Sequence, residues 1–316
     1  MNFPTSLIAD NKVADRRRFL KTSTVAIAAI AAASQSHPLA FGAEIKHTTK
    51  PRRLLKTLKV NMIRVDGDMT AKFAAAKAAG FDGVEMNAPG INVDEVTRAI
   101  EETGLPVDGS VGSTHWKRTH SNPDAAVRKQ ALDDLITGLK QTHAVGGHSL
   151  LLVVGHGKDG TEEEVWQRSV ENIKEALPVS AELGVSIVVE NVWNHFCYEH
   201  NGPNDQSAQK FADYIDAFDS PWVGMQFDIG NHWKYGNPAD WIRTLGRRIV
   251  KFDIKGFSRA KNNWADITED DLPWADVRKA IDEIEFHGWI AAEVGGGNAE
   301  RLKKIADQID LALNIA

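Results

Sequence analysis

Short apolar segments rich in β-branched residues alternate with longer segments of helical periodicity along most of the chain. Eight short segments are predicted to be strands, at 58–65, 81–87, 105–112, 148–157, 185–191, 222–230, 248–256 and 289–297. Helical patterns follow them, at about 69–79, 93–104, 123–145, 162–183, 207–218, 238–245, 275–286 and 298–313. Asn122-Pro123-Asp124 and the capping box from Thr161 to Glu164 are typical helix starts.

Eight strand–helix units in succession predict an α/β protein with parallel strands. Such units close naturally into a (β/α)₈ TIM barrel, here covering residues 58–316 as one catalytic domain. A doubly wound open sheet is the alternative. No Gly-x-Gly-x-x-Gly motif follows the first strand, which counts against a dinucleotide-binding fold.

Four of the late strands end in a carboxylate. Side chains alternate in direction along a strand, so the apolar positions show which way each acid points. In "IVKFDIK", Phe252 and its apolar neighbours face the outer helices, while Lys251, Asp253 and Lys255 face the barrel interior. The same alternation directs all four acids toward the mouth of the barrel: Glu190, Asp228, Asp253 and Glu293.

Composition narrows the class of protein further. The chain has 316 residues, 42% of them hydrophobic, and a formal net charge of −6. Its N-terminal segment is basic, so the remainder is more acidic still, which disfavours nucleic acid as a partner. Cys197 is the only cysteine, so the chain forms no internal disulfide bond.

The first 43 residues have the pattern of an export signal. A basic segment precedes a short apolar run and then small residues. Arg16-Arg17-Arg18-Phe19-Leu20-Lys21 resembles the twin-arginine consensus, with Asp15 where Ser or Thr is usual. The run is shorter than the ~20 residues that span a bilayer, although an uncleaved anchor is the open alternative. We expect cleavage near residue 43, a linker at 44–57, a periplasmic or otherwise exported protein, and no membrane contact after cleavage.

Four converging carboxylates need a counter-charge, because like charges at short range raise each other's pKa. Lys251, Lys255 and Arg259 are one source of that charge. One bound divalent ion is the other, and it is favoured because oxygen ligands suit Mg²⁺ or Mn²⁺, with Co²⁺ and Zn²⁺ as further candidates.

The segments "VVENVWNHF", "QFDIGNHW", "VKFDIKGFSR" and "AAEVGGG" resemble the sugar isomerase/epimerase superfamily with xylose-isomerase-like barrels, which includes D-tagatose 3-epimerase-type enzymes. The resemblance covers roughly residues 58–313. It implies a metal site whose ligands fall on Glu190, Asp228, Asp253 and Glu293. Better-known members have His where this chain has Asp253, and an all-carboxylate set favours Mn²⁺ or Mg²⁺ over Zn²⁺.

The resemblance also implies a reaction. A metal that binds a carbonyl oxygen and a neighbouring hydroxyl stabilises an enediolate, while Glu190 and Glu293 move the α-proton. A sugar epimerase or isomerase is the favoured function. A 3-keto-glycoside lyase or hydrolase that shares this first step, and a non-catalytic sugar-binding barrel, are the alternatives. The AP endonucleases of the same superfamily use a histidine-rich metal cluster, unlike this acidic chain.

Other polar and aromatic residues near the predicted mouth are candidates for binding a sugar or keto sugar, although an ordinary structural role is open for each. They are Glu85, His115, Trp116, His156, Trp193, His195, His232, Lys255 and Arg259. Gly295-Gly296-Gly297 opens the last helix, where its amides could hold a phosphate or only let the backbone approach a sugar. An exported enzyme seldom meets sugar phosphates, so an unphosphorylated sugar or an oxidised glycoside is expected. Whether the chain forms a homo-oligomer is left open.

Overall fold

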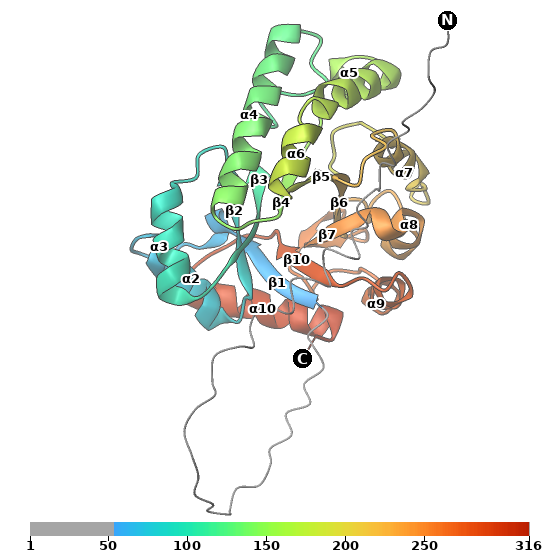
Figure 1. Cartoon of the computed structure of the whole chain (residues 1–316). Coiled ribbons are helices and arrows are strands. Elements are labelled where there is room, and N and C mark those ends of the chain that lie inside the picture. Colours follow the sequence, from blue (N-terminus) through green and yellow to red (C-terminus); the bar gives the residue numbers. More distant parts are fainter. Residues whose placement is uncertain (1–53, 316) are drawn as a thin grey trace, which may run out of the picture. The chain divides into compact units, whose positions relative to one another are not determined.

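Eight parallel strands close into a barrel in the computed structural model, which describes residues 54–315 (Figure 1). Neighbouring strands follow the order β1-β10-β7-β6-β5-β4-β3-β2, so the predicted (β/α)₈ barrel is confirmed. The predicted export signal lies outside the described residues. The barrel strands are β1 (Leu54–Lys59), β2 (Gly83–Ala88), β3 (Val107–Gly112), β4 (Ser149–Leu152), β5 (Ser186–Glu190), β6 (Val223–Asp228), β7 (Ile249–Ile254) and β10 (Gly288–Ala292).

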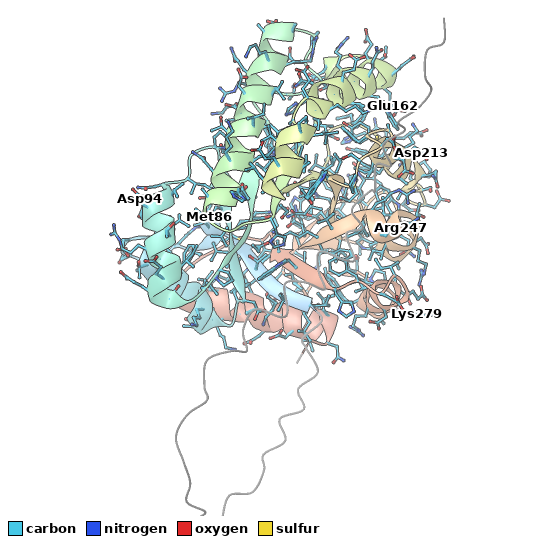
Figure 2. The ribbon with its side chains drawn as sticks, viewed as in Figure 1. Met86, Asp94, Glu162, Asp213, Arg247 and Lys279 are labelled. Atoms are coloured by element: carbon cyan, nitrogen blue, oxygen red, sulfur yellow. The ribbon has the colours of Figure 1, made fainter. Side chains whose placement is uncertain are left out.

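Helices between the strands surround the barrel (Figure 1). Figure 2 shows charged side chains such as Asp94, Glu162 and Lys279 on this outer ring, where all three are exposed. In the described part of the chain, no helix is long and apolar enough to cross a membrane. The helices are α2 (Met69–Ala79), α3 (Val93–Thr103), α4 (Ala125–Ala144), α5 (Glu162–Lys174), α6 (Leu177–Leu183), α7 (Gln209–Asp216), α8 (Pro238–Leu245), α9 (Trp274–Glu283) and α10 (Ala299–Leu313).

The predicted alternation of strand side chains is confirmed in β6 and β7. Phe227 packs against Trp241 of α8, on the helix side of the barrel. Gln226 and Lys251 face inward, where the amide of Gln226 and the ammonium of Lys251 both contact Glu85. Polar side chains therefore fill part of the barrel interior, while the apolar core lies between the strands and the helices.

Several elements differ from the pattern read along the sequence. The first strand is predicted at 58–65 after a linker at 44–57, but β1 begins at Leu54, so the barrel starts inside the expected linker. This strand ends at Lys59, and the chain turns through the short 3₁₀ helix η1 (Val60–Met62). The helix predicted at 162–183 is two helices, because Pro178 lacks the N–H that a continuous helix needs. An antiparallel hairpin of β8 (Gly256–Ser258) and β9 (Asn263–Ala265) follows β7 and was not predicted.

Candidate metal centre

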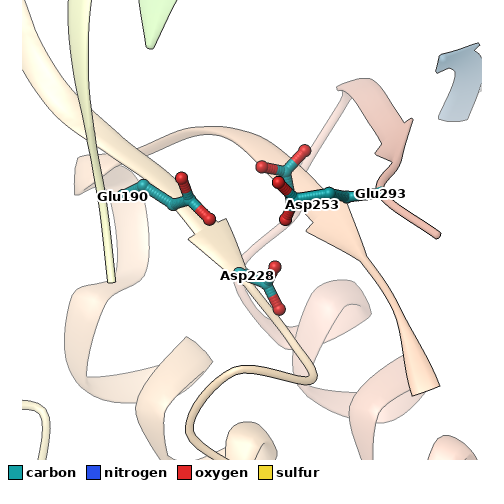
Figure 3. Close-up of side chains that lie close together, drawn as sticks. All are labelled: Glu190, Asp228, Asp253 and Glu293. Carbon is teal, nitrogen blue, oxygen red and sulfur yellow. The ribbon is translucent and has the colours of Figure 1, made fainter. Parts of the chain in front are cut away.

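Four carboxylates converge at the carboxyl ends of the strands, as the alternation predicts (Figure 3). One oxygen of each lies within 4.8 Å of the others: Glu190, Asp228, Asp253 and Glu293. The first three belong to β5, β6 and β7 and are buried. Glu293 follows β10, and its backbone N–H donates to the carbonyl of Ile254 at 3.0 Å, which anchors it beside β7.

Two asparagines hold the carboxylates of β5 and β6 in position. Asp228 accepts hydrogen bonds from the backbone N–H groups of Gly230 and Asn231 at 2.8 and 2.7 Å. The side-chain amide of Asn231 donates to Glu190 at 3.1 Å. The side-chain oxygen of Asn191 accepts from the backbone N–H of Asp228 at 2.8 Å. These bonds fix one oxygen of each acid and leave the other for a ligand.

Two lysines reach into the centre. The ammonium group of Lys59, at the end of β1, lies 3.1 Å from Asp253 and 3.1 Å from Glu85. The ammonium group of Lys255 lies 3.0 Å from Asp228 and 2.5 Å from Glu293. The counter-charge considered from the sequence is therefore present in part, and Lys59 adds a source that the sequence analysis missed.

A third lysine neutralises acids below the centre. Lys251 contacts Glu85 at 2.6 Å and also contacts Asp108. Arg259 does not face the carboxylates, because its guanidinium group donates to the carbonyls of Asn204, Trp233 and Gly236 and stacks on the Trp233 ring. Among the described residues, six carboxylates in and below the centre thus share three ammonium groups.

The excess of negative charge shows in the pKa values. Burial, with Glu293 and Glu85 nearby, raises the pKa of Asp253 to about 7 although Lys59 opposes the shift. Burial and Glu293 raise the pKa of Asp228 to about 6 against the effect of Lys255. Burial, Glu293 and Asp253 raise the pKa of Glu190 well above its ordinary value. Burial would also raise the pKa of Glu293, but Lys59 and Lys255 lower it to about 2.

These residues fit a divalent cation. All four donors are carboxylate oxygens, which suit hard ions such as Mg²⁺ and Mn²⁺. Oδ2 of Asp228 and Oε2 of Glu293 are buried and lack a conventional hydrogen bond within the described residues, although both lie beside the Lys255 ammonium. The raised pKa values of Glu190, Asp228 and Asp253 show that an additional positive charge at the centre would stabilise the ionised form of these acids.

Two of the predicted sugar-binding histidines are buried, and burial lowers the pKa of both. His232 packs against Tyr198 and Trp241, and its Nδ1 contacts the side-chain amide of Asn191. Burial and Lys255 lower its pKa to about 3. Nδ1 of His115 accepts the Val153 N–H, and burial followed by Lys59 lowers its pKa to about 4.

The other predicted binding residues differ in how far their side chains are exposed and already bonded. His156 and His195 lie side by side with ring centroids 5.3 Å apart, and Trp116 is exposed with its ring edge-on to His115. Trp193 donates its indole N–H to the Asn231 carbonyl, which fixes the ring. Glu85 is fully buried, and its oxygens already bind Lys59, Lys251 and Gln226.

Three residues that position the carboxylates were missed: Lys59, Asn191 and Asn231. The sequence could have predicted the position of Lys59, because side chains alternate along β1 and Lys59 lies two residues after Thr57, on the face opposite to Leu58. Thr57 and Lys59 both face the barrel interior, where they contact Asp108 and Asp253. No local signal marks the other two, since they reach the site through loops.

Comparisons with known proteins agree with the barrel fold. The family described as "Xylose isomerase-like TIM barrel" matches residues 73–314. No curated protein matches the chain in sequence. Among solved structures, 3-keto-D-glucoside 4-epimerase from E. coli is 17% identical with a TM-score of 0.68, covering 83% of this chain and 99% of its own. D-allulose 3-epimerase from Methylomonas sp. has the same identity, TM-score and coverage.

The IOLI protein, whose structure holds a zinc atom, is 11% identical with a TM-score of 0.67 and covers 82% of this chain and 98% of its own. At these identities the solved structures establish the fold, whereas the family match spans most of the chain. The chain belongs to the xylose isomerase-like TIM-barrel family.

Proposed function

We propose that the protein is a divalent-metal-dependent sugar epimerase or isomerase that removes a proton next to a substrate carbonyl. The observation that carries this proposal is the convergence of four carboxylate oxygens within 4.8 Å at the barrel mouth. The similar solved structures include a 3-epimerase and a 4-epimerase of sugars, which supports the same chemistry. Mn²⁺ or Mg²⁺ is the proposed ion, because all four donors of the cluster are carboxylate oxygens.

A bound divalent ion supplies stabilisation of the negative charge that develops on the substrate oxygens. Glu190 and Glu293 are the proposed proton-transfer groups. They come from β5 and β10, which β6 and β7 separate, so they approach the centre from different sides (Figure 3). One glutamate removes the α-proton and the other returns a proton to the opposite face of the same carbon. Lys255, 2.5 Å from Glu293, orients that carboxylate.

Deuterium exchange tests this function directly. The purified, Mn²⁺-loaded protein is incubated in D₂O with a panel of ketoses and 3-keto sugars, and exchange at the α-carbon is followed by NMR. Glu190→Gln and Glu293→Gln should each slow exchange by about 10²- to 10⁴-fold, the usual contribution of a general base. Glu162→Gln removes an exposed acid of the outer ring (Figure 2) and should leave the rate unchanged.

The products identify the reaction that follows proton removal. A new stereoisomer or an aldose–ketose pair supports epimerisation or isomerisation, whereas an unsaturated sugar indicates elimination. Absence of exchange with every sugar, in protein that demonstrably holds Mn²⁺, would contradict catalysis and favour a sugar-binding barrel.

A further inference from the structure

A cavity lies beside the carboxylate centre. Its volume is about 600 Å³, and it is bounded by the β8–β9 hairpin, the loop after β10 and the first turns of α10. Of the four acids only Glu293 lines it, together with Lys255 on the same border. Cavities of this size hold drug-sized ligands. The space therefore exceeds the needs of one sugar ring, and it adjoins the reacting position.

An aromatic ring forms one wall of this cavity. Trp264 of β9 is 46% exposed and stacks on Trp193, with ring centroids 4.9 Å apart and planes 25° apart. Phe257 of β8 supports both indoles through edge-on contacts. Trp193 is itself fixed by its bond to the Asn231 carbonyl, so the Trp264 ring is supported from one side, and the Lys255 ammonium group lies 5.1 Å from the centre of the Trp264 ring at the border with the carboxylate centre. A large exposed aromatic surface in a concave site is typical of ligand binding.

The charged residues that line the cavity are paired with one another. Arg301 binds Asp266 through two hydrogen bonds of 2.6 and 2.8 Å, and its Nε donates to the Gly295 carbonyl at 3.0 Å. Lys255 is likewise paired with Glu293. A phosphate or carboxylate would have to displace one of these acids. Hydroxyl groups can instead bind the outer faces of such pairs, since they both donate and accept hydrogen bonds.

The glycines before α10 are explained without a phosphate. A Cβ at Gly296 would lie 2.1 Å from the Met62 carbonyl oxygen, so the residue lets the loop pack against η1. The N–H of Gly297 donates to that carbonyl at 3.0 Å, and the Gly297 carbonyl accepts from Arg64. The loop amide of Gly297 is thus already used, which removes the main reason to place an anion there.

We propose that this cavity binds the second, uncharged sugar ring of a glycoside whose first ring reacts at the carboxylate centre. The second ring stacks on Trp264, and its hydroxyls bind the Arg301–Asp266 pair. The substrate class is then a keto glycoside and not a free monosaccharide. This inference rests on the proposed function, because Glu293 is the residue shared by the two sites.

Two probes test the subsite: methyl 3-keto-glucopyranoside, and a 3-keto disaccharide that carries glucose on the anomeric oxygen of the oxidised ring. The Mn²⁺-loaded full chain should exchange the α-proton of the disaccharide with at least tenfold higher kcat/KM. Trp264→Ala should lower that value about three- to tenfold, mainly through KM, the range expected for one aromatic contact. The same variant should leave the methyl glycoside within twofold, and Trp264→Phe should recover most of the loss.

Gly295→Leu is a second variant that does not depend on removing a packed ring. Gly295 lines the cavity, and a Cβ at this position meets no atom within 4 Å, so the backbone accepts a side chain there and a leucine should fill part of the cavity. It should abolish the preference for the disaccharide and retain turnover of the methyl glycoside. Equal kcat/KM for both probes in the unaltered protein, or equal losses for both in Trp264→Ala, would overturn the subsite.

Failure of the proposed function gives a different result. If neither probe exchanges, binding is followed by tryptophan fluorescence with the same two compounds. Tighter binding of the disaccharide that is lost in Gly295→Leu would support the subsite and contradict the proposed catalysis. If neither probe changes the tryptophan fluorescence, both the subsite and the proposed function would be contradicted.

Discussion

Lys59→Met tests whether the β1 lysine and a metal ion compete for the same negative charge. The ammonium group of Lys59 lies 3.1 Å from Glu85 and from Asp253, whose side chains are fully buried, and the lysine itself is 13% exposed. Methionine preserves the length and apolar stem of the side chain but removes the charge. The variant therefore leaves the buried carboxylates with less compensation and little change in packing.

The expected loss of stability without metal is large. Removing one partner of a buried ion pair costs about 3–5 kcal/mol. For a domain of this size, that corresponds to a drop in melting temperature of roughly 6–20 °C, at ~2–4 °C per kcal/mol. Mn²⁺ at a hundred times its Kd contributes about 2.7 kcal/mol to any protein that binds it only when folded. Because the centre of the variant is more negative, its Kd for Mn²⁺ should be lower. At a fixed concentration of Mn²⁺, its melting temperature should therefore rise more than that of the unaltered protein.

Lys56→Met is the matched control. Lys56 lies on the same strand, and its side chain is also buried. Its ammonium group lies 2.6 Å from Asp310, which is not one of the four acids of the centre. This variant should lose stability but respond to Mn²⁺ as the unaltered protein does. Thermal melts in EDTA and across a MnCl₂ series, with calorimetric titration of each protein, make the comparison. An equal Mn²⁺ response in all three proteins, or weaker binding by Lys59→Met, would refute the competition.

Three further predictions concern the ion and the leader. Burial raises the pKa of Asp253 to about 7 and that of Asp228 to about 6, and both carboxyls must be deprotonated to bind a metal ion, so the affinity for Mn²⁺ should rise from pH 6 to pH 8. Calorimetry in buffers of different ionisation enthalpy should detect the released protons, and Asp253→Asn should make the affinity less dependent on pH. Asp253→His introduces a nitrogen ligand and should shift the selectivity of the site from Mn²⁺ toward Zn²⁺. Elemental analysis after competition between the two ions measures this shift, and an unchanged ratio of bound Zn²⁺ to bound Mn²⁺ would show that Asp253 is not a ligand. Replacing Arg16 and Arg17 by lysine should leave uncleaved precursor inside the cell, as fractionation would show; normal export of this variant would contradict a twin-arginine signal.

Local patterns were enough to predict the barrel and its four acids. The direction of a side chain on a strand depends on its neighbours two positions away, so "IVKFDIK" alone directs Asp253 inward and Phe252 toward the helices. Helix ends were similarly local, since Thr161 and Glu164 form the predicted capping box. The break between α5 and α6 could also have been predicted, because Pro178 is visible in the sequence.

Contacts that cross the barrel needed the tertiary structure. Lys59 and Asp253 are 194 residues apart, and they meet because closure of the sheet places β1 beside β10 and β10 beside β7. Arg259 follows Lys255 by four residues, yet the β8–β9 hairpin directs it to backbone carbonyls and away from the acids. Alternation along a strand fixes which face a charge occupies, but barrel closure and loop paths decide which partner it meets, because those depend on packing between distant segments.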